Sequence, residues 1–186
     1  MACTSIFLLV AAIFGVTSGQ IISWGRCPDV PSKRNFEMSK YGGTWYEMES
    51  YPAAWYSSST TCGHTSFAMT DDGSMEITSG GLDRSGESYT LTGSASIPDT
   101  NEPAKLLLRY SRWSSQDYQV VATDYRSFSL VYACANYGFF RSEKVWLLTR
   151  QPGQMNPRST KRAYKMLRTY GLDSEPLTTT WTDQCN

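Results

Sequence analysis

Apolar and polar residues alternate with a period of two in a series of short segments that covers most of the chain. The first segment begins at Gly43-Thr44-Trp45-Tyr46, so Trp45 faces one side of a strand and Tyr46 faces the other. Turn-forming residues separate it from further alternating segments at 61–70, 74–79, 88–97, 104–113, 118–125, 128–135 and 143–150. Eight short strands at nearly even spacing predict an all-β fold, either an antiparallel up-and-down barrel or a sandwich.

One longer helix is expected after the last of these strands. Pro157 suits a helix start, and Gly171 suits a helix end. Between them, apolar residues recur at helical spacing, at Ala163, Met166, Leu167 and Tyr170. A short helical turn near 35–41 and a short last strand near 177–181 complete the pattern. The absence of a linker or an internal repeat from the sequence predicts a single domain.

Residues 1–19 have the pattern of a secretory signal peptide. They are uncharged, with an apolar run from Ile6 to Val16 and small residues after it. The run is too short to span a bilayer. We therefore expect a secreted, extracellular protein whose single domain comprises residues 20–186.

Four cysteines remain after this segment, namely Cys27, Cys62, Cys134 and Cys185. An even number of cysteines in an exported chain indicates disulfide bonds, and four cysteines allow three pairings. The spacing of these four does not choose between the pairings. They lie far apart, without a CxxC motif or clustered histidines, so no metal site is expected.

The charge balance argues against several classes of partner. The chain has 17 basic and 17 acidic residues and no basic cluster, so a nucleic acid partner is not expected. Charged residues make up 18% of the chain, whereas 12 Tyr, 7 Phe and 6 Trp make it rich in aromatic residues. This composition suggests a lined cavity or an adhesive surface. Nothing in the sequence indicates an oligomeric state.

Three motifs in this order resemble those of the lipocalin family: Gly43-Thr44-Trp45-Tyr46, Thr123-Asp124-Tyr125, and Arg150 at the end of Trp146-Leu147-Leu148-Thr149-Arg150. Gly25-Arg26-Cys27-Pro28 and Tyr46-Glu47-Met48-Glu49 are also similar to the apolipoprotein D-like branch of that family, with its invertebrate bilin- and carotenoid-binding members. The resemblance covers about residues 25–185. It implies an eight-stranded antiparallel up-and-down barrel with one C-terminal helix packed outside.

The same resemblance implies roles for the motif residues. Trp45 would lie across the closed end of the barrel with the guanidinium of Arg150 over its indole, and Gly43 and Asp124 would belong to the same floor. These roles are structural, and no catalytic residue is expected among them. The resemblance also implies the disulfide pairing Cys27–Cys134 and Cys62–Cys185.

The phase of each strand predicts which side chains line the barrel. Because Arg150 must point inward, Leu148 and Trp146 do so too. On 104–113, the charges of Lys105 and Arg109 belong outside, so the alternate residues point inward. The predicted ligand-binding residues are Trp55, Phe67, Met69, Ile77, Leu91, Leu106, Leu108, Tyr110, Tyr118, Val120, Val131, Trp146 and Leu148. The alternative is that these side chains fill a solid core.

Two carboxylates on the first strand complicate this lining. Glu47 and Glu49 share the phase of Trp45, and a buried unpaired carboxylate is costly. We therefore expect a β-bulge that turns them outward, or contact with water. If one of them does face the cavity, it favours a ligand with a hydrogen-bond donor. His64 falls on the outward phase.

Together these features predict a carrier of a small hydrophobic ligand, such as a lipid, fatty acid, sterol or retinoid. The alternative is a pigment carrier with a bound bilin or carotenoid, and no cofactor is obligatory. An isomerase of the kind found among lipocalins would need a free cysteine inside the barrel. The four mature cysteines are committed to disulfides in the predicted pairing, and His64 has no evident partner. We therefore expect no enzyme activity.

Large aromatic residues occupy the loops predicted at the open end of the barrel, notably Trp113, Phe139 and Phe140. Arg112 and Arg141 flank them. One possibility is that the aromatic side chains fold inward as a lid over the cavity. The other is that they contact a membrane or lipoprotein surface, where Trp favours the interface.

Overall fold

The computed structural model describes residues 21–52, 61–71, 74–83, 85–182 and 185. Its strands are β1 (Ile21–Trp24), β2 (Gly43–Ser50), β3 (Thr61–Met69), β4 (Met75–Leu82), β5 (Ser88–Ser96), β6 (Lys105–Ser111), β7 (Ser114–Thr123), β8 (Phe128–Tyr137), β9 (Phe140–Thr149) and β10 (Thr178–Thr179). Its helices are α1 (Met38–Tyr41) and α2 (Pro157–Thr169). The expected helical turn, late helix and short last strand are all present.

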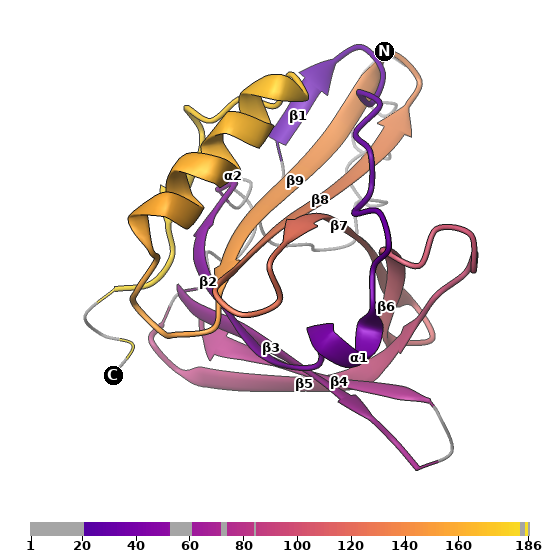
Figure 1. Cartoon of the computed structure of the whole chain (residues 1–186), viewed down its shortest axis with the longest axis vertical. Coiled ribbons are helices and arrows are strands. Elements are labelled where there is room, and N and C mark those ends of the chain that lie inside the picture. The colour runs from indigo at the N-terminus through magenta and orange to yellow at the C-terminus, as the bar shows by residue number, and fades with distance from the viewer. Residues whose placement is uncertain (1–20, 53–60, 72–73, 84, 183–184, 186) are drawn as a thin grey trace, which may run out of the picture.

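The strands β2 to β9 form a closed antiparallel barrel (Figure 1). Each strand pairs with the next one along the chain, and β9 also pairs with β2, which closes the ring. Side chains on each strand alternate between the interior and the outer surface, as the period-two pattern requires. The predicted eight-stranded up-and-down barrel is confirmed.

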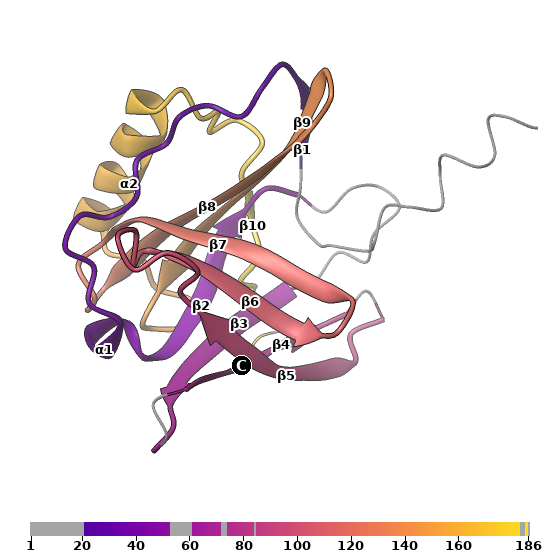
Figure 2. The same ribbon diagram turned by 90° about the vertical axis from the view of Figure 1, so that its right-hand side faces the viewer.

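The helix α2 lies outside the barrel, along the side formed by β8 and β9 (Figures 1 and 2). It begins where the side chain of Asn156 accepts a hydrogen bond from the backbone N–H of Arg158, one residue after Pro157. Ala163 and Leu167 are fully buried in a second apolar core that also includes Leu130, Val145 and Leu147 of the barrel wall. This outer core fixes the helix to the sheet.

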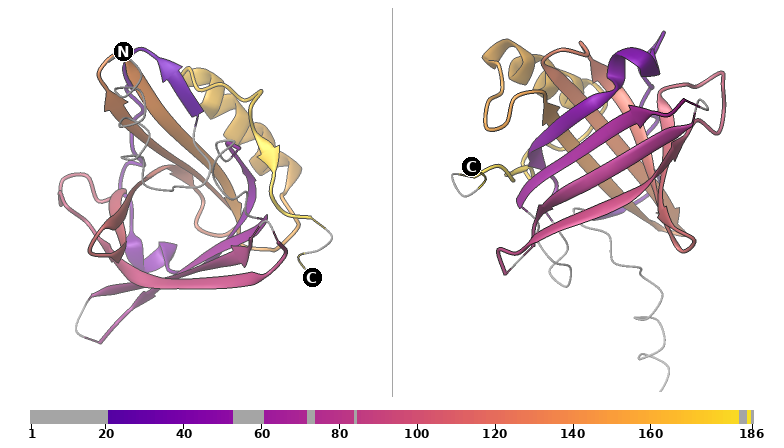
Figure 3. Two further views of the ribbon diagram at one scale, coloured as in Figure 1. Left: turned by 180° about the vertical axis from the view of Figure 1, so that it is seen from behind. Right: turned by 90° about the horizontal axis from the view of Figure 1, so that it is seen from below.

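Two short strands extend the sheet beyond the barrel (Figure 3). β1 pairs with the first part of β9, from Ile21 opposite Glu143 to Trp24 opposite Phe140. This strand is not among those predicted from the sequence, because four residues are too few to show a periodic pattern. β10 pairs with the end of β2, so the C-terminal segment lies against the barrel wall.

Two disulfide bonds fasten these terminal segments. Cys27 is bonded to Cys134 of β8, and Cys62 of β3 is bonded to Cys185. The pairing implied by the family resemblance is therefore confirmed. Each bond joins residues more than 100 positions apart in sequence, so each one restricts the unfolded chain strongly.

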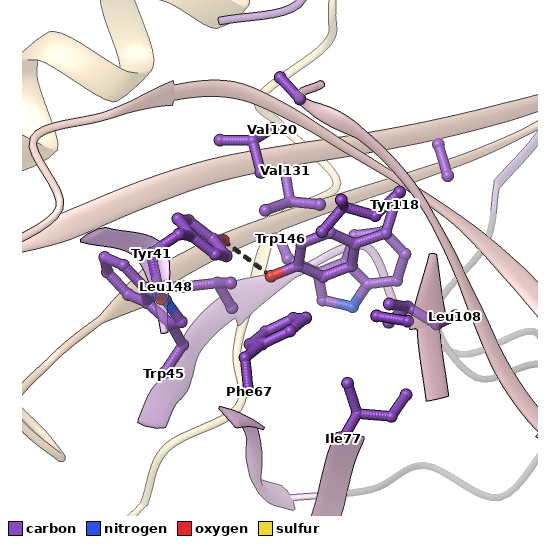
Figure 4. Packing of buried hydrophobic residues seen from close by; sticks show 14 of the residues in the cluster. Tyr41, Trp45, Phe67, Ile77, Leu108, Tyr118, Val120, Val131, Trp146 and Leu148 are labelled. Carbon is purple, nitrogen blue, oxygen red and sulfur yellow. Dashed lines mark hydrogen bonds between the residues drawn. The ribbon is translucent and has the colours of Figure 1, made fainter. Parts of the chain in front are cut away.

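The barrel interior is apolar and rich in aromatic residues (Figure 4). Among the residues predicted to point inward, the inner core contains Phe67, Ile77, Leu106, Leu108, Tyr118, Val120, Val131, Trp146 and Leu148, with Tyr110 packed against it. Their inward placement follows the predicted strand phases. Their contact with a ligand stays a prediction.

The placement of Met69 and Leu91 differs from the prediction, because both side chains are largely exposed, at 55% and 49%. Met69 forms the last rung of the β3–β4 hairpin, opposite Met75, beyond the rung where β2 begins. The hairpin thus extends past the barrel floor. Leu91 lies on β5 before its pairing with β6 begins at Ser94, so it has a strand neighbour on the β4 side, at Ser79, and none on the β6 side. Neither residue lines the enclosed interior.

Two further predictions fall on parts of the chain outside the described residues. These are the signal peptide at 1–19 and Trp55 in the loop after β2.

Candidate functional site

The closed end of the barrel is formed by a stacked arginine and tryptophan. The guanidinium carbon of Arg150 lies 3.7 Å from the centroid of the Trp45 ring, and Trp45 is fully buried. The guanidinium also donates hydrogen bonds to five backbone carbonyls. They are those of Thr44, Tyr41, Gly42, Tyr125 and Lys40, at 2.7–3.4 Å. The structural role predicted for this pair fits these contacts.

The other two motif residues shape the backbone around this pair. Gly43 has a φ of +85°, and a Cβ at this position would lie 3.2 Å from an Arg150 nitrogen. The Asp124 carboxylate accepts hydrogen bonds from the backbone N–H groups of Arg126, Ser127 and Phe128 and from the Ser127 hydroxyl. Partial burial would raise the Asp124 pKa, but these hydrogen bonds outweigh it and lower the pKa. Asp124 thus holds the turn that begins β8.

A buried hydroxyl network lies directly above the floor. The Tyr41 hydroxyl is 2.9 Å from those of Tyr118 and Ser129, and the first contact is drawn in Figure 4. The Tyr41 ring stacks on Trp45. Burial raises the pKa of Tyr41 to about 12, although its hydroxyl partners and Arg150 oppose the shift. Both phenols therefore stay neutral at physiological pH and can only act as hydrogen-bonding groups.

A cavity of about 50 Å³ lies above this floor. Its lining includes five of the predicted ligand-binding residues, Leu108, Tyr110, Tyr118, Trp146 and Leu148. Trp45 forms its base, and Glu47, His64, Thr65 and Gln116 complete its wall. The lining is mainly apolar with a few polar groups, as is typical of small-molecule sites.

Glu47 and Glu49 point to opposite sides of the barrel wall. The pairing of β2 with β9 shifts between them, so that Glu47 lies opposite Leu148 and Glu49 opposite Leu147. The expected bulge is therefore present, but it turns only Glu49 outward, where its carboxylate is 2.5 Å from the Tyr164 hydroxyl of α2. Burial raises the pKa of Glu47, and hydrogen bonds with the Ser50 and Thr180 side chains oppose the shift.

A second cavity, of about 160 Å³, adjoins the first one toward the open end. Gln116 lines both cavities, and Lys144 of β9 lines the second. Lys144 is not among the predicted lining residues, although the phase that places Trp146 inside the barrel also places Lys144 there.

Both cavities are smaller than the roughly 300–1,000 Å³ of sites that enclose drug-sized ligands. A ligand of that size therefore requires inner side chains to move, or it extends beyond the described walls. A flexible, elongated molecule fits these two small cavities more easily than a rigid, wide one.

The aromatic side chains at the open end are exposed. Trp113 in the β6–β7 turn is 88% exposed and Phe139 in the β8–β9 turn is 82% exposed, so neither folds inward as a lid. Phe140 packs on Trp24 of β1, with ring centroids 4.2 Å apart. Arg141, predicted to flank this patch, pairs with the buried Glu143 at 2.6 Å and donates a hydrogen bond to the backbone carbonyl of Trp24.

In the described part of the chain, no group of three or more His, Cys, Asp or Glu side chains is placed to hold a metal ion. No helix in the same residues has the length and apolar character needed to cross a membrane.

Known proteins resemble this chain in both sequence and fold. Residues 36–182 match the family described as the lipocalin-like domain. Mouse apolipoprotein D is 32% identical over 179 residues, covering 95% of this chain and 92% of the mouse protein. The bilin-binding protein of Pieris brassicae is 26% identical over 149 residues, 77% of each chain. The solved structure of insecticyanin from Manduca sexta superposes with a TM-score of 0.77 at 19% identity, covering 90% of this chain and 92% of insecticyanin.

Proposed function

The chain belongs to the lipocalin family, and on this premise we propose that it carries one small hydrophobic molecule inside its barrel, as an apolipoprotein D-like lipid transporter. The ligand class is that of lipids, fatty acids, sterols and retinoids. The observation that carries the proposal is the apolar and aromatic cavity above Trp45. The apolipoprotein D-like branch is non-enzymatic, which agrees with the predicted absence of a catalytic role.

A pigment carrier is the second candidate. The bilin-binding relative supports it, and Tyr110, Tyr118 and Trp146 offer aromatic faces on which a conjugated ligand can stack. The absorption spectrum of protein purified from its natural source separates the two candidates. A visible absorption band supports a bilin or carotenoid, whereas a colourless protein with extractable lipid supports lipid transport.

The carrier proposal is tested by titrating the protein with a fatty acid, a sterol, a retinoid, a carotenoid and a bilin. A ligand in the cavity should quench the fluorescence of Trp146. Tyr110→Ala or Trp146→Ala should weaken binding by about 1–3 kcal/mol, because each removes a large apolar surface. Tyr46→Ala, on the outer side of the same barrel, is the control and should bind as wild type does. Failure of the whole panel to bind would overturn the carrier function.

We also propose that the exposed aromatic side chains contact a lipid surface during ligand transfer. Trp113 and Phe139 lie in two turns at the same end of the barrel, and Arg112 is close to the Trp113 ring, at 5.3 Å. Wild type should float with liposomes, and Trp113→Ser combined with Phe139→Ser should float less. Met69→Ser, which removes an exposed apolar side chain at the other end of the barrel, is the control. Equal flotation of all three, or none by wild type, would contradict the proposal.

Secretion completes the proposed role. The apolar segment 1–19 and the two disulfides support export to an extracellular, oxidising environment. Amino-terminal sequencing of the secreted protein tests the segment, and we expect a start near Gln20. A secreted protein that retains residues 1–19 would refute this assignment.

A further inference from the structure

Lys144 is a buried cation on the inward face of β9. It is 8% exposed, and it lies on β9 opposite Ala133 of the inner core. Its ammonium nitrogen lies 5.9 Å from the centroid of the Trp146 ring. Among the described residues, no carboxylate forms an ion pair with Lys144, and no oxygen accepts a hydrogen bond from it. Lysine is rarely buried in this way, because a desolvated ammonium is costly unless it is paired.

The surroundings of Lys144 confirm that this charge is poorly compensated. Burial lowers its pKa to about 8, and the negative charge of Asp117 on β7 acts in the opposite direction. Asp117 itself is exposed, and the other titratable side chain that lines this cavity is Tyr137 of β8. At pH 7 the amine is still mostly protonated, so a positive charge faces a cavity in which the exposed Asp117 carboxylate compensates it only in part.

The cavity at Lys144 is built differently from the one above Trp45. It lies where β7 and β8 separate. Both strands are fully described, and their pairing runs from Thr123 opposite Ser129 to Gln119 opposite Tyr132 and no further toward the open end. Its lining includes the polar residues Ser115, Gln116, Asp117 and Ser142. Gln116 joins it to the apolar cavity that contains Trp146. A polar compartment with one cation thus adjoins an apolar compartment.

We propose that Lys144 binds the carboxylate of an amphiphilic ligand whose apolar part lies against Trp146, farther inside the barrel. This inference rests on the proposed carrier function and narrows its ligand class to molecules with an anionic end. A carboxylate supplies the hydrogen-bond acceptor that the ammonium lacks, and the interaction is strong because both groups are charged and shielded from water.

Glu47 is another charged side chain that lines the interior, and it is a weaker candidate for the partner of the ligand's polar end. Its carboxyl group already has the Ser50 and Thr180 side chains as hydrogen-bond partners within the wall. The Lys144 ammonium has no such partners among the described residues. The orientation of the ligand therefore follows, with its anionic end toward the open end of the barrel.

The experiment compares dodecanoate with dodecanol, which share one alkyl chain and differ at the head group. Binding of each is measured by calorimetry for wild type, Lys144→Met and Lys105→Met. Methionine keeps the length of the side chain and removes its charge. Lys105 is the matched control, because its ammonium is paired with Glu102 on the outer surface of the barrel. Circular dichroism establishes that each variant is folded.

Lys144→Met should weaken dodecanoate binding by about tenfold to hundredfold and leave dodecanol binding unchanged or tighter. Lys105→Met should match wild type for both ligands. An equal loss for both ligands in Lys144→Met, or no loss for either, would overturn the role of Lys144 while leaving the carrier function intact. If wild type binds neither these two ligands nor any member of the wider panel, the carrier function fails as well.

Discussion

Two cations lie at opposite ends of the barrel, and their surroundings differ in kind. The Arg150 guanidinium lies against Trp45 and donates hydrogen bonds to five backbone carbonyls. The Lys144 ammonium lies near Trp146 with no acceptor among the described residues. A cation bonded to several backbone carbonyls stabilises the fold, whereas a buried one without acceptors costs stability and is available to a ligand. Charge alone does not distinguish these roles.

The largest expected effect is at the closed end. Arg150→Ala should lower the free energy of unfolding by about 3 kcal/mol, because it removes the partner of Trp45 and leaves buried carbonyls without donors. Denaturant unfolding measures the change, and Arg126→Ala, in the nearby exposed turn, is the control. Unchanged stability together with lost ligand binding would show that Arg150 contacts the ligand instead.

Removing the charge of Lys144 is expected to raise the free energy of unfolding instead of lowering it. Its folded pKa of about 8 lies below the ordinary 10.5, so the unfolded chain binds more protons between these values and stability rises with pH across this window. At pH 7 the full penalty is present. Lys144→Met should therefore raise the free energy of unfolding by roughly 1–3 kcal/mol at pH 7. The gain should shrink as the pH approaches 10, and a gain independent of pH would contradict the account.

Smaller effects on stability, of opposite sign, are expected from replacing the two carboxylates of β2. The pKa of Glu47 is raised in the folded protein, so its contribution to stability is greatest at low pH and is lost as the pH rises through that pKa. Glu47→Gln should remove this loss and raise stability near pH 7 by about 0.5–1 kcal/mol. Glu49→Gln should instead lower it slightly, because it weakens the hydrogen bond from Tyr164. Equal effects of the two changes would place both side chains on one side of the wall.

The closed end could be predicted from the sequence much more completely than the open end. The motif residues Trp45, Asp124 and Arg150 fix the floor, and strand phase places most of the inner core. The different orientations of Glu47 and Glu49 depend on a bulge in the pairing of β2 with β9, nearly 100 residues away. The local pattern predicts a bulge in this strand, but not that the bulge leaves Glu47 inward and turns only Glu49 outward.

The remaining differences have similar causes. The exposure of Met69 and Leu91 depends on where their hairpins end relative to neighbouring strands, which phase alone does not give. Lys144 has the same inward phase as Trp146, but it is absent from the predicted lining residues. Lys144 is therefore informative, because a lysine inside the barrel is costly unless a partner compensates its charge.

The most direct test of the contrast between the two ends is the pKa of Lys144, measured by NMR on protein with isotopically labelled lysine. Without ligand, we expect a Lys144 pKa of about 8. Saturation with dodecanoate should raise this pKa, because a carboxylate beside the ammonium stabilises its charged form, and saturation with dodecanol should not. A pKa near 10.5 in the free protein, or the same pKa with both ligands, would contradict the claim that the open end holds an unpaired cation for a ligand.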